Sequence, residues 1–381
     1  MTAEHPAEVE RESGATFLEL FFDLVFVFAI TQVTALIRQE GEVASFLPAA
    51  LVFALVWWAW SQFTWVGNAV DMGDRWHRVV VLAATGSAFF MAQAVTDALG
   101  HDGEWFGVAY ALTMLLGLGL YWVGLRHDRD HQRALLTYIP IAGPASLVVA
   151  VGGFLGTSIR PWVLAFALVL FGLSGLAAER GHAFRIAPRH FAERHALIVI
   201  IALGEAVIAV GIAAAGLERT AAFMAAIAVG VIGSLALWWA YFDWFQETAE
   251  ERLRARPALA RAAFARDVYT FGHYPLVFGI VAFAVAVEEA VAHPGEHLEA
   301  LGRFGLAAGI VLYLAGSAAV YLRAGGILLV ERIATAVVAV AVVVALPDLD
   351  AVAALGIVVG SMVVGLVLER IRHHAGALRL G

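Results

Sequence analysis

Residues 17–32 read FLELFFDLVFVFAITQ, an apolar run that carries two carboxylates, Glu19 and Asp23. The rest of the chain is similarly apolar, because 61% of its 381 residues are hydrophobic, only 15% are charged and the mean hydropathy is +0.82. In a soluble domain about half of the residues are apolar and about a quarter are charged. The sequence therefore predicts an integral membrane protein whose surroundings are a lipid bilayer.

Two residue types are missing from the chain. It contains no cysteine, and all 24 of its basic residues are arginine. The absence of cysteine excludes disulfides, thiolate metal ligands and thiol catalysis, and the absence of lysine excludes Schiff bases and the Walker A motif. No histidine pair has the spacing of a helical zinc motif, and the net charge of −8 argues against nucleic-acid binding. We therefore expect no metal site, no cofactor and no nucleic-acid partner.

Twelve apolar runs come close to the roughly 20 residues that a helix needs to cross the hydrocarbon core of a bilayer. The predicted fold class is therefore all-α, a polytopic transmembrane helix bundle. The runs cover residues 16–37, 46–66, 77–99, 104–125, 132–155, 160–178, 191–214, 221–245, 264–290, 299–322, 326–346 and 351–371. The longest connection, residues 246–263, is rich in arginine and glutamate and is expected to form an interfacial or cytoplasmic linker helix.

Arginine is distributed unevenly between the two sets of alternating loops. Twenty arginines fall on the side of the N-terminus, and only Arg38, Arg160, Arg219 and Arg303 fall on the other. Positive residues are retained on the cytoplasmic side of a membrane, and the first residues lack the basic region and cleavage site of a signal peptide. We expect a multi-pass membrane protein with both termini in the cytoplasm.

Two pairs of segments suggest an internal duplication. Residues 55–63 (LVWWAWSQF) align without a gap with residues 236–244 (ALWWAYFDW), and residues 17–19 (FLE) align with residues 191–193 (FAE). Chance similarity among apolar, tryptophan-rich helices is the alternative. A real duplication gives two parallel six-helix halves, as in major-facilitator transporters. The expected segments are an N-terminal segment 1–15, a first half 16–178, a linker 179–190, a second half 191–371 and a tail 372–381.

Placing a charged side chain inside a bilayer costs a few kcal/mol of free energy. Ionisable residues within the apolar runs are therefore the natural functional candidates. Glu19 and Asp23 lie one turn apart on one helical face, and Thr34 lies nearly in line with Asp23. The two carboxylates either share a proton, or Glu19 lies at the interface while Asp23 binds an arginine of a neighbouring helix. Glu205 is a second deep carboxylate, surrounded by small residues that let another helix or a cavity approach.

Histidines add two further candidate sites. Glu193 and His195 lie at the beginning of the same helix as Glu205, where a carboxylate also stabilises the helix dipole. His273 precedes Pro275, which removes a backbone donor and favours a kink that frees a carbonyl beside the imidazole. This kink is either a proton or cation site or merely architectural.

Tryptophans also occur away from the interfacial belts where they are usual. Trp57, Trp58, Trp238 and Trp239 lie within apolar helices, so they either pack in the core or line a cavity. Their indole N–H groups, and that of Trp60, need acceptors, which carboxylates such as Asp23 or Glu205 could supply.

Three segments resemble the bacterial low temperature requirement A family: residues 17–32, residues 193–205 and residues 269–279. Their order and spacing extend over nearly the whole chain. The resemblance implies a multi-pass protein of the bacterial cell (inner) membrane, linked by the family name to growth in the cold. It leaves substrate and reaction open. It singles out the motif residues Glu19, Asp23, Glu193, His195 and Glu205.

Three functions are compatible with these features. The first is a secondary transporter or ion-coupled permease without enzymatic activity, in which Asp23 and Glu205 face a central cavity and exchange protons with an unknown small molecule or ion. The second is an intramembrane enzyme in which Glu193, His195 and arginines hold a lipid or isoprenoid phosphate; the arginines expected to do so are Arg180, Arg185, Arg189 and Arg194. The third is a structural or sensory membrane protein. No catalytic residue and no oligomeric state are predicted.

Overall fold

The structure is a computed structural model that describes residues 14–178, 186–325 and 328–374. Over these residues the chain is helical, and the single isolated β-bridge joins His297 to Asp350. Ten helical segments of the described residues are long and apolar enough to cross a bilayer. The predicted fold class, a polytopic helical membrane protein, is therefore confirmed.

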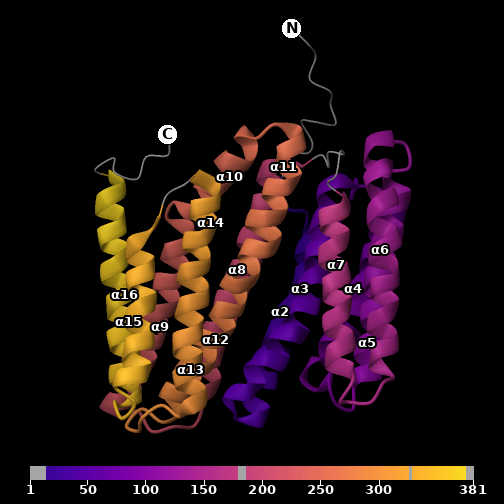
Figure 1. Ribbon diagram of the computed structural model, residues 1–381. Coiled ribbons are helices and arrows are strands. Elements are labelled where there is room, and N and C mark those ends of the chain that lie inside the picture. The colour runs from indigo at the N-terminus through magenta and orange to yellow at the C-terminus, as the bar shows by residue number, and fades with distance from the viewer. Residues whose placement is uncertain (1–13, 179–185, 326–327, 375–381) are drawn as a thin grey trace. The chain divides into compact units, whose positions relative to one another are not determined.

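The chain divides into two compact units. Unit 1 contains the described residues up to Leu36, Phe46–His195 and Leu253–Asp267. Its helices α4, α5, α6 and α7 pack in chain order, each against the next, and α3 packs against α5 and α7 (Figure 1). The helices of unit 1 are α2 (Phe17–Glu40, up to Leu36), α3 (Phe46–Ala69), α4 (Arg75–Gln93), α5 (Gly103–Gly124), α6 (Arg129–Gly153), α7 (Arg160–Ala178), the beginning of α8 (Pro188–Ala213) and α11 (Ala258–Ala265), with the 3₁₀ turn η2 (Val95–Asp97).

Unit 2 contains Ile37–Ser45, Ala196–Arg252 and Val268–Gly381. Its central helix is α12, which packs against α9, α13, α14 and α16, and all residues from 276 to 288 are buried. The elements of unit 2 are the 3₁₀ turn η1 (Val43–Ser45), the rest of α8 from Ala196 onward, α9 (Ala221–Phe242), most of α10 (Phe245–Ala255), α12 (Gly272–Ala292), α13 (Ala300–Ile310), the π-helical turn η4 (Val311–Ala315), α14 (Gly316–Gly325), α15 (Val330–Ala345) and α16 (Ala351–His374).

The observed helices follow the predicted runs closely, with three differences. The π-helical turns η3 (Arg266–Phe271) and η4 interrupt the ninth and tenth runs. The linker 246–263 forms two helices, α10 and α11, because Pro257 disfavours helical backbone in the residue before it. Finally, α4 and α15 were predicted to span the membrane but are not among the ten segments, and α15 has only 16 residues. The duplication stays a prediction.

Capping residues fix several helix ends. Asp74 caps α4 by accepting hydrogen bonds from the backbone N–H groups of Trp76 and His77. These bonds, first that of His77 and then that of Trp76, lower the pKa of Asp74 below its ordinary value. Asp128 caps α6 in the same way. The two caps define the beginnings of the two helices that flank α5.

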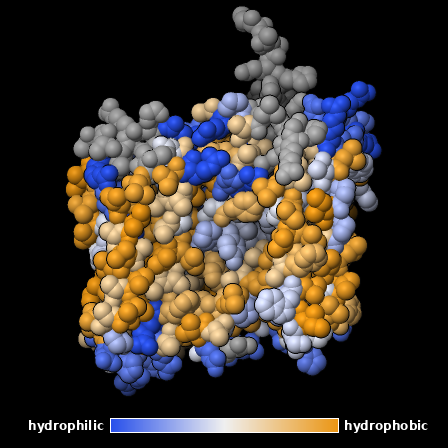
Figure 2. All heavy atoms as spheres, in the orientation of Figure 1, coloured by the Kyte–Doolittle hydropathy of each residue, from blue (hydrophilic) through white to orange (hydrophobic). Residues whose placement is uncertain are grey.

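Large apolar side chains cover the flanks of the helices. Figure 2 shows hydrophobic residues (orange) along these flanks and hydrophilic residues (blue) gathered near the helix ends. Exposed side chains such as Phe166 and Val337 are more than half accessible. Such surfaces are stable in contact with hydrocarbon, where all backbone groups are paired within helices. The helices therefore require a lipid bilayer as their environment.

Candidate functional site

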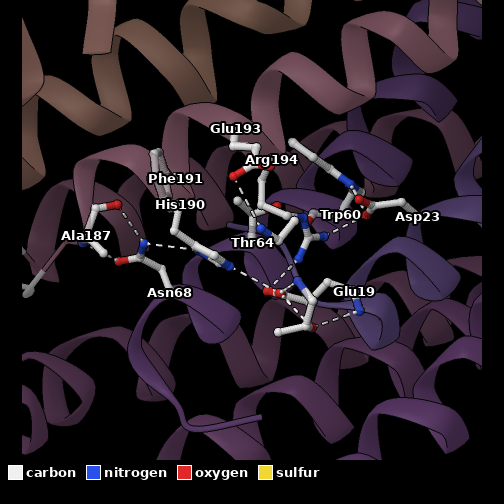
Figure 3. Close-up of polar contacts among 12 residues, drawn as sticks. Glu19, Asp23, Trp60, Thr64, Asn68, Ala187, His190, Phe191, Glu193 and Arg194 are labelled. Carbon is white, nitrogen blue, oxygen red and sulfur yellow. Dashed lines mark hydrogen bonds and ion pairs between the residues drawn. The ribbon is translucent and has the colours of Figure 1, made fainter. Parts of the chain in front are cut away.

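A group of buried polar side chains in unit 1, which we call the charged cluster, joins α2, α3 and α8 (Figure 3). Its members are Glu19 and Asp23 from α2, Trp60 and Asn68 from α3, and His190 and Arg194 from α8. Glu19, Asp23 and Arg194 are only 3%, 1% and 1% exposed. The charged groups therefore depend on one another, because they have almost no access to solvent.

Arg194 bridges the two carboxylates of α2. Its Nη1 lies 2.8 Å from Oε1 of Glu19, and its Nη2 lies 2.6 Å from Oδ1 of Asp23. The spacing of one helical turn between Glu19 and Asp23 places both carboxylates within reach of one planar guanidinium. The alternative in which Asp23 binds an arginine of a neighbouring helix is what the structure shows.

Glu19 is fully hydrogen-bonded as an anion. Besides Arg194, its Oε2 accepts bonds from the backbone N–H of Thr16 at 2.9 Å, the Thr16 hydroxyl at 2.8 Å and Nε2 of His190 at 3.1 Å. The backbone N–H of Glu19 donates to the Thr16 hydroxyl in return. Thr16 and Glu19 thus form a capping box at the beginning of α2. Glu19 is a first-turn residue, but the side chains of α8 bury it.

His190 has a defined tautomer in this network. The amide nitrogen of Asn68 donates to the carbonyl of Ala187 at 3.2 Å and lies 3.4 Å from Nδ1 of His190, while the Asn68 oxygen accepts from the Ala187 N–H at 3.1 Å. Because the amide nitrogen is a donor, Nδ1 of His190 is the acceptor and the ring proton is on Nε2. In this tautomer Nε2 of the imidazole donates to Glu19.

Only one of the two carboxylate oxygens of Asp23 accepts hydrogen bonds from described residues. Its Oδ1 accepts from Nε1 of Trp60 at 2.8 Å and from Arg194, so Asp23 supplies the acceptor that the tryptophan indole was expected to need. Its Oδ2 is buried and has no hydrogen-bond partner among the described residues, and neither has Nε of Arg194. The charged cluster thus contains an unoccupied acceptor inside a membrane helix.

The other predicted residues of unit 1 lie around this cluster. His195 is buried, its Nδ1 donates to the carbonyl of Phe191 at 2.9 Å, and its ring meets that of Trp60 edge-on. The carboxylate of Glu193 accepts a hydrogen bond from the backbone N–H of Ala15. Trp57 packs against Trp60 in the core. In addition, Trp58 stacks on Phe171, and the hydroxyl of the buried Thr34 donates to the carbonyl of Ile30.

Unit 2 contains the remaining candidates. Glu205 is 3% exposed and interacts electrostatically with Glu288, which Arg38 binds at 2.7 Å. Trp238 and Trp239 are 44% and 45% exposed. Asp23 and Glu205 belong to different units, so their predicted pairing and the predicted cavity between them stay predictions.

His273 lies beside irregular backbone, as its neighbouring proline predicted. The carbonyl that it meets, however, is that of Val268 in η3, which accepts a hydrogen bond from Nδ1 at 3.0 Å. A π-helical turn shifts the backbone pairing by one residue and leaves such a carbonyl available. The hydroxyl of Tyr241 lies 2.7 Å from Nε2, within hydrogen-bond distance. The buried imidazole is thus held on both sides.

Sequence reasoning missed a second buried ion pair, in unit 2. Arg332 binds Glu369 with two bonds of 2.8 Å and also donates to the Ser317 hydroxyl and the Ala240 carbonyl. Trp244 donates to the same carboxylate at 2.9 Å. Arg332 was counted with the arginines on the side of the N-terminus, although its position within the predicted run 326–346 could have indicated a buried pair. In the described part of the chain, no group of three potential ligands has the geometry of a metal site.

Comparison with known proteins agrees with the helical architecture. The sequence model of the bacterial low temperature requirement A protein (LtrA) matches residues 14–367. The chain is also 28% identical over 320 residues to an uncharacterized protein of Rhizobium meliloti (strain 1021), an alignment that covers 80% of this chain and 76% of the relative. No solved structure matches the chain significantly. Because the family match includes the charged cluster and nearly all helices, the chain belongs to the bacterial low temperature requirement A family.

Proposed function

We propose that this membrane protein is an ion-coupled secondary transporter in which Asp23 carries the coupling proton. The observation that supports this proposal is the composition of the charged cluster, in which two buried carboxylates share one guanidinium. In the tautomer whose Nδ1 accepts from Asn68, His190 carries no charge, and two carboxylates then meet one guanidinium. An uncompensated charge inside a bilayer is costly. One proton on a carboxylate restores neutrality.

The hydrogen bonds favour Asp23 as the carrier of that proton. Glu19 already accepts four bonds, which leaves its oxygens occupied. Oδ2 of Asp23 accepts none, so a proton there displaces no existing donor. Loss of the proton makes Asp23 a second full anion against Arg194 and changes the forces between α2 and α8. A coupled transporter needs such a link between protonation and helix contacts.

The ion pair of unit 2 provides a useful contrast. Arg332 and Glu369 are matched one to one through two bonds, and the pair is neutral without any additional proton. This is the arrangement that a purely structural lock requires. The charged cluster of unit 1 has one carboxylate more than such a lock, which favours transport over the structural function.

The enzyme hypothesis receives less support. Arg194 is already bound by two carboxylates, so it is not available for a phosphate group. Arg180 and Arg185, which were also expected to bind the phosphate, lie outside the described residues. His195 and Glu193 both hydrogen-bond to backbone groups. The described residues around the cluster therefore offer no set of groups in position for hydrolysis or transfer.

Charge displacement after a pH step tests the proposal without a known substrate. Liposomes containing the purified protein are adsorbed on a solid-supported membrane, and a rapid pH change produces a transient current when protons bind within the membrane. We expect a current for the wild type and its loss in Asp23→Asn, which keeps the Oδ1 contacts to Trp60 and Arg194. Asp243→Asn is the matched control, because Asp243 pairs one to one with Arg370.

An unchanged current in a folded Asp23→Asn variant would contradict the assignment of the proton to Asp23. The double variant Asp23→Asn with Glu205→Gln then separates the two carboxylates. If the double variant alone loses the current, Glu205 is the carrier. If even the double variant keeps it, carboxylate-coupled transport is wrong.

A further inference from the structure

We infer that the hairpin of α5 and α6 binds one anionic phospholipid, with the phosphate at the arginines of the turn and the acyl chains in two grooves beside α5. This site lies within unit 1 and involves no residue of the charged cluster. It does not depend on the transport proposal. The inference uses the shape of the grooves, the order of residues along them and the charge at one end.

The two grooves are neighbours that flank one ridge of α5. The larger, about 450 Å³, lies between α5 and α6, and its walls include Trp122, Leu136, Pro140 and Gly143. The smaller, about 180 Å³, lies between α4 and α5. Leu115 and Gly119 line both. Apart from His77, every residue that lines them is apolar or glycine, as contact with hydrocarbon chains requires.

Gly119 keeps the ridge between the grooves low. A Cβ added there would meet no atom within 4 Å, so the position opens onto empty space. Gly143 on the facing helix is similar, with its nearest atom 4.0 Å away. A lipid with two chains can therefore place one chain on each side of this ridge, with the chains joined at the end of the helix.

A single stripe of α6 leads from arginine to the groove. Arg129, Arg133, Leu136, Pro140 and Gly143 follow one another at intervals of three or four residues, which puts them on one helical face. The arginines lie at the beginning of the stripe and the groove residues follow. The order matches a phospholipid, in which a charged phosphate is followed by hydrocarbon chains.

The end of the hairpin carries a surplus of accessible positive charge. Arg126, Arg129 and Arg133 are exposed. Of the two carboxylates in the turn, Asp128 is occupied in capping α6, and Asp130 forms only an exposed pair of 3.6 Å with Arg133. Such pairs are weak and exchange readily. Figure 2 shows a hydrophilic (blue) region where Figure 1 places the start of α6. Guanidinium groups bind phosphate oxygens through two parallel hydrogen bonds.

The dimensions also match one leaflet. The groove follows α6 from Leu135 to Gly143, which is about 12 Å at 1.5 Å per residue. Half of the hydrocarbon core of a bilayer is about 15 Å. Trp76 and Trp122 lie at the arginine end of the grooves and are 65% and 40% exposed, as tryptophans at a membrane interface are.

Native mass spectrometry of the full-length protein tests the site. The protein is released from nanodiscs that contain phosphatidylglycerol and phosphatidylcholine with identical acyl chains. We expect one retained phosphatidylglycerol per chain in the wild type. In the double variant Arg129→Gln with Arg133→Gln, its apparent affinity should fall on the order of thirtyfold, at about 1 kcal/mol for each arginine.

A second variant tests the grooves. Gly119→Leu should remove the retained lipid by filling the space between the grooves, since a Cβ at this position meets no atom within 4 Å. Gly172→Leu in α7 is the matched control, since Gly172 is equally open. Arg189→Gln with Arg219→Gln controls for the loss of two exposed arginines elsewhere. Excess glycerol phosphate without acyl chains should not displace the lipid.

Three results would overturn the inference. Equal retention of phosphatidylcholine and phosphatidylglycerol by the wild type would show that ordinary boundary lipid fills the grooves. Loss of the lipid in the control variants to the same extent would assign it to another surface. A dimer that disappears in Gly119→Leu while the retained lipid stays would show that a second copy of the chain, and not a lipid, covers this face.

Discussion

At Gly67, in α3, an added Cβ would lie 2.2 Å from Oε1 of Glu19 and 3.6 Å from Nη1 of Arg194. The glycine therefore leaves the space in which the Glu19 carboxylate meets the guanidinium. Glu19 cannot move aside freely, because Thr16 and His190 hold its other oxygen. A single methyl group at this position should separate Glu19 from Arg194.

We expect Gly67→Ala to lower the free energy of unfolding by about 1–3 kcal/mol, the cost of leaving a buried polar group without its partner. The midpoint of thermal unfolding in detergent measures the effect. Gly86→Ala in α4 is the control, because a Cβ there meets no atom within 4 Å. That substitution should be neutral or stabilise by up to about 1 kcal/mol. Equal midpoints for the two variants would contradict the steric role of Gly67.

The importance of Glu19 and Asp23 could be predicted from the sequence, because carboxylates in an apolar run are costly unless they are bound. Their partner could only be described as an arginine of another helix. Arg194 is 171 residues from Asp23, and nothing local to α2 identifies it. The roles of His190 and Asn68 were equally hidden, since they depend on the approach of α3 to α8.

Among the elements, α15 is the one whose placement depends most clearly on a single side chain. Arg332, in its first turn, contacts residues of α9, α14 and α16 through Ala240, Ser317 and Glu369. The indole of Trp244 binds the same carboxylate. One guanidinium therefore links four helices of unit 2.

Glu369→Gln should destabilise the protein by roughly 3–5 kcal/mol, because it leaves the guanidinium buried without a counter-charge. The double variant Arg332→Met with Glu369→Leu removes both charges. Its loss in free energy of unfolding should be smaller than the sum of the losses in Arg332→Met alone and Glu369→Leu alone. Unfolding midpoints of the single and double variants give the coupling, expected at about 1–3 kcal/mol. Additive losses would show that the two side chains act independently.

Element boundaries were predictable where composition changes sharply and were wrong where backbone geometry changes within an apolar run. The turn η4 lies inside a continuous hydrophobic segment and η3 lies near the beginning of a predicted run, so hydropathy gave no sign of either turn. For η3 the nearby Pro275 did indicate irregular backbone. For η4, Gly309 lies where α13 meets α12, and a Cβ there would be 2.7 Å from the backbone of Phe283. This close packing depends on a helix that is distant in sequence.

For the whole molecule, the distribution of arginines predicts that successive loops alternate between the two sides of the membrane, with both termini in the cytoplasm. Three of the arginines in that count are buried rather than in loops, namely Arg160, Arg194 and Arg332. Even so, the exposed Arg126 and Arg129 at the α5–α6 turn and the exposed Arg254 near the end of α10 keep the same bias. Because the chain contains no cysteine, single cysteines can be introduced as reporters without a background signal.

We expect His127→Cys, in the α5–α6 turn, and Arg256→Cys, between α10 and α11, to react with a membrane-impermeant maleimide only after the cytoplasmic side is opened. His101→Cys, before α5, and Gly156→Cys, before α7, should react in intact spheroplasts. All four positions lie in turns between helices, so the substitutions should leave the spans intact. If His101 and His127 react from the same side, α5 does not cross the membrane. The alternation then fails from that helix onward, which would contradict the predicted number of spans.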